Sequence, residues 1–317
     1  MKSWLGTGIV CTLLFAPVLD ATEPAAPAAP AAAKSPAPVR QRTFDTPKAA
    51  ADALIAAAAS YDVPALKAIL GPDGADLVAT SDPVQDRNQL ETFAAKAREK
   101  NEVVPDAKNP NLAILSVGEG DWPMPIPIVR KGGKWLFDSK AGRREVLYRR
   151  VGRNELDAIE ACRNFVEAQH EYASKKRDGS SVNQYAQRII ATPGKQDGLV
   201  WKNPDGTLGG PLGEELADAI AQGYTKKSAP FHGYYFKVLK GQGPAAPLGE
   251  IDFVVKGVMI GGFALAAAPA DYLVTGVMTF IVSHDGIVYE KDLGPKTLET
   301  FYAMERYNPD KSWRPVK

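Results

Sequence analysis

The stretch GGFALAAAPADYLVTGVMTFIVSHDGIVYEKDLG, residues 261–294, decides the fold, because it alternates short apolar runs with glycines and turn residues. Short runs rich in Val, Ile, Phe and Tyr between turn residues are typical of β-strands. The dipeptide Asp285-Gly286 separates two such runs and favours a tight turn. We therefore expect residues 276–294 to form a hairpin, with further strands in YYFKVL (234–239) and in residues 251–269.

A helix is predicted over residues 141–176, where apolar and small residues recur at spacings of three and four. The expected core-facing stripe is Leu156, Ile159, Cys162, Val166, Gln169 and Ala173. Arginines crowd the start of this helix, at Arg143, Arg144, Arg149, Arg150 and Arg153. They favour either a solvated face with salt bridges to Glu145 and Glu155 or a site for an anionic ligand. Shorter helices are expected in residues 183–192, ended by Pro193-Gly194, and in residues 211–224.

The N-terminal half predicts helices followed by strands. Thr46 is a typical N-cap and Pro47 suits the first helical position, so a helix begins there. A second short helix stops at Gly71, and a third covers residues 86–101. Strands follow in residues 111–118 and 125–138, the latter turned at Gly132-Gly133. The order predicts a small α+β unit that closes near Asp138.

The N-terminal segment MKSWLGTGIVCTLLFAPVLDATEP has one lysine and then an apolar run from Trp4 to Leu19. This run is shorter than the roughly 20 residues that cross a bilayer. It predicts a signal peptide over residues 1–21, cut after Ala21, and therefore a periplasmic or secreted protein.

An Ala/Pro-rich tract follows, and it predicts an extended linker over residues 22–43. Lipidation at Cys11 is an alternative to cleavage, although TGIV before it lacks the small residues that such a site requires. If the signal peptide is removed, Cys162 is the only cysteine left, and no disulfide can form within the chain.

The amino-acid composition argues against two classes of function, nucleic-acid binding and a role as a membrane-spanning protein. The chain has 317 residues, a hydrophobic fraction of 45% and a formal net charge of +1. Without an excess of positive charge, a dedicated nucleic-acid binder is not expected. The most apolar run after the N-terminus carries Lys256 with several Gly and Pro residues, so no membrane span is expected in the mature chain, which we predict to be a monomer.

Four blocks of the sequence carry a family resemblance: DAIEACRNFVEAQHEYA, HGYYFKVL, the stretch from FALAAAP to YEKDLG, and GDWPMPIPIVRKGGKWLFD. With them, the chain from Phe44 to the C-terminus resembles an uncharacterised bacterial envelope family, domain of unknown function 2950 (DUF2950). The resemblance implies no activity.

Two further resemblances concern architecture. The C-terminal half is similar in element order to the soluble part of type IV pilin-like proteins and pseudopilins, in which a helix packs on an antiparallel sheet. It lacks their long apolar N-terminal helix. The N-terminal half resembles the cone-shaped fold of the nuclear transport factor 2 superfamily. We therefore expect an α+β protein of two modules, a cone-like domain over residues 44–140 and a pilin-like domain over residues 141–317.

Five residues are candidates for a binding site: Trp122, His232, Tyr234, His284 and Asp285. Prolines at 123, 125 and 127 hold the segment after Trp122 extended, which is typical of a sheet edge or a docking surface. Tyr234 belongs either to an aromatic platform for sugar or peptidoglycan or to the core. His284 and Asp285 form a site if they face His232 across the sheet; otherwise each histidine belongs to a turn or a strand end.

Residues for catalysis or for metal binding are not apparent. The three histidines are scattered, no cysteine pair exists, and no nucleophile elbow or phosphate-binding loop occurs. The acidic turns lack the spacing of a calcium loop. We therefore expect no catalytic residue, no metal site and no cofactor. Cys162 lies on the apolar stripe, which favours an inert packed thiol.

Three functions remain open. The first hypothesis is a non-enzymatic binding or assembly factor of the envelope, with an envelope protein or cell-wall ligand as its partner. The second is a periplasmic hydrolase or small-molecule enzyme with a site in the N-terminal cone or at the domain junction. The third is a minor-pilin-like secretion component.

Overall fold

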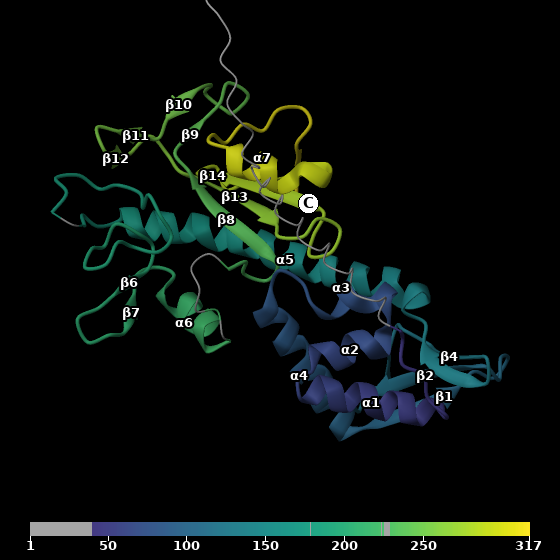
Figure 1. The fold of residues 1–317 in the computed structure, drawn as a ribbon. Coiled ribbons are helices and arrows are strands. Elements are labelled where there is room, and N and C mark those ends of the chain that lie inside the picture. The colour runs from purple at the N-terminus through teal and green to yellow at the C-terminus, as the bar shows by residue number, and fades with distance from the viewer. Residues whose placement is uncertain (1–39, 178, 223, 225–228) are drawn as a thin grey trace, which may run out of the picture. The chain divides into compact units, whose positions relative to one another are not determined.

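The computed structural model describes residues 40–177, 179–222, 224 and 229–317 (Figure 1). The predicted signal peptide and most of the predicted linker lie outside these residues. Helices and antiparallel sheets together confirm the α+β class. The helices are α1 (Pro47–Ala59), α2 (Val63–Leu70), α3 (Ala75–Val78), α4 (Pro83–Glu99), α5 (Ser139–Ala173), α6 (Gly213–Ala221) and α7 (Thr297–Ala303). In the described part of the chain, none of them has the length and apolarity needed to span a bilayer.

The N-terminal helices begin where N-cap side chains fix them. Thr46, Asp62 and Asp82 each accept a hydrogen bond from a backbone N–H in the first turn, at 3.1, 3.0 and 3.0 Å, and each is followed by a proline at one of the first two helical positions. The cap satisfies a backbone donor that the helix leaves free, and the proline has no N–H to lose. Thr46 confirms the predicted start of the first helix.

The N-terminal sheet has the strand order β1-β2-β4-β5, with β3 paired to β2. Its strands are β1 (Asn101–Pro105), β2 (Leu112–Val117), β3 (Trp122–Pro123), β4 (Ile128–Lys131) and β5 (Lys134–Phe137). The predicted turn at Gly132-Gly133 is confirmed, with φ of 59° and 81° at the two glycines. Buried side chains of α1, α2 and the strands, among them Leu66, Ile69 and Leu115, form the first hydrophobic cluster.

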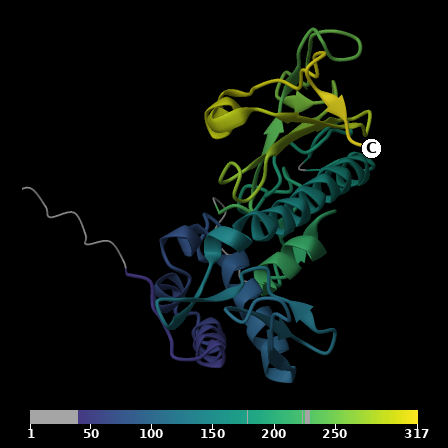
Figure 2. The same cartoon turned by 90° about the vertical axis from the view of Figure 1, so that its right-hand side faces the viewer.

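The C-terminal sheet has the antiparallel order β16-β15-β14-β13-β8. Its strands are β8 (Tyr234–Leu239), β13 (Ala264–Pro269), β14 (Met278–Ser283), β15 (Val288–Asp292) and β16 (Arg314–Pro315). Helices α5 and α7 lie on opposite faces of this sheet (Figures 1 and 2), and every residue of β13 is buried. This explains why β13 is a continuous apolar run rather than an alternating one. The predicted hairpin of residues 276–294 is confirmed.

Three short strand pairs complete the C-terminal half: β6 (Trp201–Lys202) with β7 (Leu208–Gly209), β9 (Gly241–Gln242) with β10 (Ile251–Asp252), and β11 (Val254–Val255) with β12 (Val258–Met259). Residues 251–269 therefore do not form one strand. Lys256 and Gly257 turn the chain between β11 and β12, with φ of 52° and 82°.

The helix predicted for residues 183–192 is wrong. This segment is an irregular loop, and its backbone groups bond to distant partners: Tyr185 donates to Met259 O at 2.8 Å, and Ala191 donates to Val200 O at 2.8 Å. Gln169 fixes Ala186 twice, because its side chain donates to the Ala186 carbonyl and accepts from the Ala186 N–H, both at 2.8 Å. Non-local partners for the backbone outweigh the local helical pattern.

A second hydrophobic cluster lies in the C-terminal half and includes Phe253, Phe263 and Phe280. Helix α5 spans 35 residues and contributes to both clusters. Val146 and Leu147 pack against the first cluster, whereas Cys162 and Phe165 belong to the second. The predicted stripe is partly wrong, because Leu156 is 68% exposed. Asn154, two positions earlier, is fully buried instead, and it donates to Thr275 O at 2.9 Å and accepts from Gln85 Nε2 at 2.9 Å. A polar residue with buried partners thus sets the rotation of the helix.

A second buried polar residue, Asp82, joins the N-terminal helices to the C-terminal half. While one carboxylate oxygen caps α4, the other accepts hydrogen bonds from Tyr224 Oη at 3.0 Å and from Gly233 N at 2.9 Å. Asp82 is 1% exposed, so these bonds are shielded from water. Nearby, Asp271 accepts from the Ser81 N–H and hydroxyl, both at 2.7 Å.

We predict that Asp82→Ala costs about 3–5 kcal/mol of unfolding free energy, because it removes a cap and leaves two buried donors without their charged acceptor. Thr46→Ala is the matched control, since Thr46 caps a helix without such partners, and it is expected to cost about 1 kcal/mol. Urea unfolding followed by circular dichroism measures both. Equal losses for the two variants would show that the contacts of Asp82 to the C-terminal half contribute nothing.

The thiol of Cys162 is fully buried, and burial raises its pKa to about 12. We predict that thiol reagents label it about a thousandfold more slowly than an ordinary cysteine, because only the thiolate reacts. A Cys11→Ser chain isolates this thiol, and urea provides the unfolded reference. Stoichiometric labelling within minutes in the folded state would contradict its placement in the core.

Candidate functional site

His232 lies at the tip of a tight turn. Phe231 and Tyr234 exchange both backbone hydrogen bonds, at 2.8 and 3.0 Å, so His232 and Gly233 form a two-residue connection with φ of 47° and 76°. These are the angles of a type I′ turn, which glycine adopts readily. A Cβ at Gly233 would lie 2.5 Å from Asn154 Nδ2 and 2.9 Å from Thr275 Cβ, so no other residue fits there without displacement.

The ring of His232 is held by a carboxylate. Its Nδ1 lies 2.7 Å from Asp157 Oδ2, its Nε2 lies 3.3 Å from Gln222 Oε1, and its plane stacks on Phe231. A carboxylate that orients imidazole is one half of a general-base arrangement. The other half, a hydroxyl or thiol nucleophile, is not among the described hydrogen-bond partners of this ring.

His284 and Asp285 lie at the other end of the sheet from His232. In the register of β13, Tyr234 is opposite Pro269, whereas Ser283 is opposite Ala264. Five residues along a strand separate the two positions by about 16 Å. The structure therefore does not bring the two histidines together.

The remaining sequence candidates have separate surroundings. Tyr234 is buried, and its hydroxyl donates to Met278 O at 2.9 Å. Asp285 shapes the hairpin turn, where it accepts from Ser283 Oγ and Ile287 N. Trp122 is 59% exposed at the sheet edge, with the Arg149 guanidinium 5.4 Å from its ring. Tyr234 and Asp285 thus have evident structural roles, and Trp122 keeps an accessible face.

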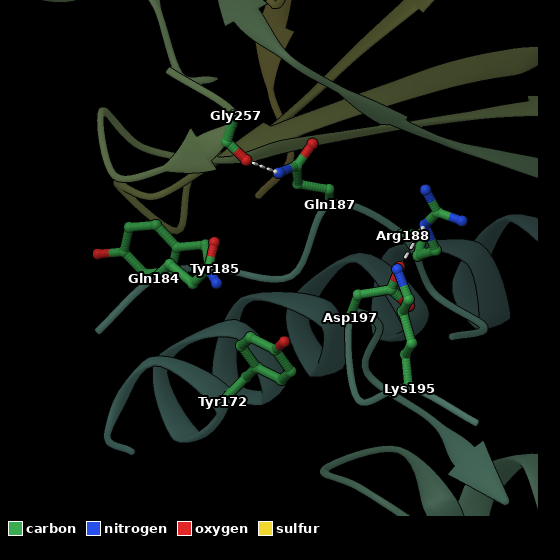
Figure 3. Close-up of a pocket in the computed structure, with 8 residues that line it drawn as sticks. All are labelled: Tyr172, Gln184, Tyr185, Gln187, Arg188, Lys195, Asp197 and Gly257. Carbon is green, nitrogen blue, oxygen red and sulfur yellow. Dashed lines mark hydrogen bonds and ion pairs between the residues drawn. The ribbon is translucent and has the colours of Figure 1, made fainter. Parts of the chain in front are cut away.

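A cavity of about 560 Å³ lies elsewhere in the C-terminal half (Figure 3). Four parts of the chain line it: the end of α5, the irregular segment 184–188, the loop 195–197 and the tip of the β11–β12 hairpin. The lining residues are Tyr172, Gln184, Tyr185, Gln187, Arg188, Lys195, Asp197 and Gly257. Its volume suits a ligand of one or two sugar rings.

The walls of this cavity are held by hydrogen bonds that cross between segments. Gln187 Nε2 donates to Gly257 O at 2.7 Å and so fastens the hairpin tip to the segment 184–188 (Figure 3). Tyr172 donates its hydroxyl proton to Gln196 O, which ties the loop to α5. Tyr185 packs edge-on against Phe263 with ring centroids 4.8 Å apart. The cavity is therefore formed before any ligand arrives.

The cavity lining carries more positive than negative charge. Asp197 accepts from Thr192 N at 2.7 Å and from Thr192 Oγ1 at 2.8 Å, and Arg188 lies 3.7 Å from it. Burial alone would raise the pKa of Asp197, but the bonds from Thr192 and the charges of Arg188 and Lys195 lower it, so the carboxylate stays ionised. Two cations face this one anion among the lining residues. The excess positive charge favours an anionic group on a ligand.

A second hollow, of about 420 Å³, is lined by Asp76, Ala79, Thr80, Ser81, Asp271, Tyr272 and Val274. Its acids already have partners: Asp76 pairs with Arg143, and Asp271 binds Ser81. Within the described residues, no three histidine, cysteine or acidic side chains are grouped as a metal site requires. We therefore take the cavity beside Tyr185 as the candidate site.

Sequence reasoning missed this site because its residues come from a segment interpreted as a helix. Pro193-Gly194 and the polar run that follows gave the only signal, a loop. Most of the arginines at the start of α5 have partners within the protein. Arg143 pairs with Asp76, and Arg149 pairs with Glu145 at 2.8 Å. Arg150 donates to the carbonyls of Asp76 and Leu77. The predicted pairing with Glu145 is observed, whereas Glu155 accepts from the N–H groups of Val277 and Met278.

Comparison with known proteins gives a family without an activity. No solved structure and no curated protein matches the chain significantly. One family model matches residues 41–316, which is nearly the whole described fold and agrees with the resemblance seen in the sequence blocks. The chain therefore belongs to the family described as "Protein of unknown function (DUF2950)".

Proposed function

We propose that this protein is an exported envelope protein that binds a ligand without altering it, and that the cavity beside Tyr185 is its binding site. The N-terminal apolar run and Ala/Pro tract support export. The observation that carries the binding role is the cavity itself, which combines planar polar side chains, aromatic rings and an excess of positive charge. Such linings suit a sugar that carries a carboxylate.

The chemistry of the lining favours binding over hydrolysis. Asp197 is the carboxylic acid in the lining, and both of its oxygens are engaged by Thr192. Because its pKa is lowered, it has no proton to give to a leaving group. A hydrolase that uses two carboxyl groups requires a second one, and the described residues of the lining do not include it. Asp197 therefore serves to position Arg188 and the loop.

We predict that the disaccharide N-acetylglucosaminyl-N-acetylmuramic acid binds this cavity more tightly than di-N-acetylchitobiose, because the two differ chiefly in one carboxylate. Titration calorimetry measures both. Arg188→Gln is expected to lower affinity for the acidic sugar about tenfold or more, as for loss of a hydrogen bond between charged groups. Lys296→Gln is the matched control, because Lys296 is exposed and outside the cavity lining.

The outcomes separate the hypotheses. No saturable binding of either sugar would reject a wall saccharide as the ligand. Equal binding of both sugars would reject the role of the cations. Release of monosaccharides during the titration, detected by chromatography, would replace the binding role with a hydrolase.

The alternative enzyme places its base at His232, which the observed pair with Asp157 favours. Against this alternative, the backbone of His232 is committed to the turn, and its N–H donates to Tyr224 Oη at 3.3 Å. If a chromogenic ester or glycoside is turned over and His232→Gln abolishes turnover without lowering the melting temperature, the enzyme hypothesis replaces ours. We expect instead that this variant melts lower and that neither protein shows turnover.

A further inference from the structure

The hairpin β11–β12, which forms one rim of the cavity, exposes aliphatic side chains. Val255 is 45% exposed and Ile260 is 50% exposed, on either side of a tip formed by Lys256 and Gly257. Isolated exposed aliphatic residues are ordinary on protein surfaces. Here two of them lie on one short hairpin with a lysine at its tip.

This hairpin is held firmly in the fold. Phe253 and Met259 at its base are fully buried in the second hydrophobic cluster. Hydrogen bonds from Tyr185 N to Met259 O and from Gln187 Nε2 to Gly257 O fix its body and its tip. The exposure of Val255 and Ile260 is therefore a property of the folded structure.

Basic residues lie on the hairpin tip and on the other segments that line the cavity or adjoin its lining. Arg188 and Lys195 share the cavity lining with Gly257. Lys175 and Lys176 come three and four residues after Tyr172, another lining residue, just beyond the end of α5. With Lys256 these side chains are exposed. In the part of the chain that the structure describes, Asp197 is the one carboxylate that pairs with any of them. The chain as a whole is nearly neutral, so this concentration is local.

We propose that this end of the C-terminal half docks on the surface of a bilayer that contains anionic lipid. The lysines and Arg188 contact lipid phosphates, while Val255 and Ile260 enter the boundary between headgroups and acyl chains. Peripheral attachment of this kind combines buried apolar area with electrostatic attraction. An anionic wall polymer would satisfy the cations but would offer no apolar layer for the two aliphatic side chains. That difference selects the bilayer.

Vesicle flotation tests the proposal with the mature protein, residues 22–317, which contains the whole described fold and lacks the apolar run from Trp4 to Leu19. We expect it to float with vesicles of phosphatidylcholine mixed with phosphatidylglycerol and to remain at the bottom with phosphatidylcholine alone. Lys256→Gln is expected to lower the partition coefficient about fivefold, the contribution of one basic residue near a charged surface. Val255→Asp is expected to lower it at least as much, and added salt lowers it for every chain.

Leu248→Asp and Lys296→Gln are the matched controls. Leu248 is 88% exposed on the loop between β9 and β10, and Lys296 precedes α7. Both variants are expected to float like the unaltered protein, and circular dichroism checks that every variant is folded. Three outcomes would each overturn the proposal: no flotation with anionic vesicles, equal flotation with neutral ones, or flotation of Val255→Asp equal to that of Leu248→Asp.

The docking surface shares Arg188 and Lys195 with the sugar site, but other residues distinguish the two. Val255→Asp leaves the cavity lining intact, so its affinity for the acidic disaccharide is expected to stay unchanged when flotation is lost. Conversely, Arg188→Gln is expected to lose most of its sugar binding while its flotation falls only modestly. That result would show that sugar binding and membrane docking can be lost independently.

Discussion

The carboxylate of Asp82 is the contact on which the described fold depends. It caps the N-terminus of α4, and at the same time it accepts hydrogen bonds from Tyr224 and from Gly233 in the C-terminal half. A buried carboxylate is unfavourable unless such donors surround it. The turn that carries Gly233 must therefore reach Asp82, and it does so only because glycine leaves room for Asn154 and Thr275.

Helix α5 connects this buried hydrogen-bonded region around Asp82 and Gly233 to the rest of the C-terminal half. Asn154, near its middle, bonds to Gln85 on α4 and to Thr275 beside β14, so the rotation of the helix is fixed where the two hydrophobic clusters approach each other. From there the helix presents Cys162 and Phe165 to the sheet and ends at the cavity with Tyr172. The rotation of α5 that Asn154 fixes thus determines which side chains of the helix reach the candidate site.

Local signals in the sequence predicted the parts of the fold that local physics determines. Thr46 with Pro47, the glycine pair at 132–133 and the turn at Asp285-Gly286 each act within a few residues, and all are observed. Predictions failed where distant partners decide. The segment 183–192 has a helical pattern, but hydrogen bonds to Gln169 and Met259 hold it in another conformation. On α5, Asn154 is buried and Leu156 is exposed, the reverse of what their polarity predicts. The cavity was missed for the same reason, because no local pattern assembles its four segments.

The way in which those segments are joined also bears on function. Each wall of the cavity is fastened by a hydrogen bond to a different element: Tyr185 to β12, Gln187 to the hairpin tip and Tyr172 to the loop. A ligand that enters such a site orders few groups, so less of its interaction energy is lost to entropy. Thr192, Arg188 and Lys195 lower the pKa of Asp197, so its carboxylate is a weaker base than an ordinary aspartate and has no proton to donate. A cavity that is formed in advance and carries excess positive charge is what the proposed binding role requires.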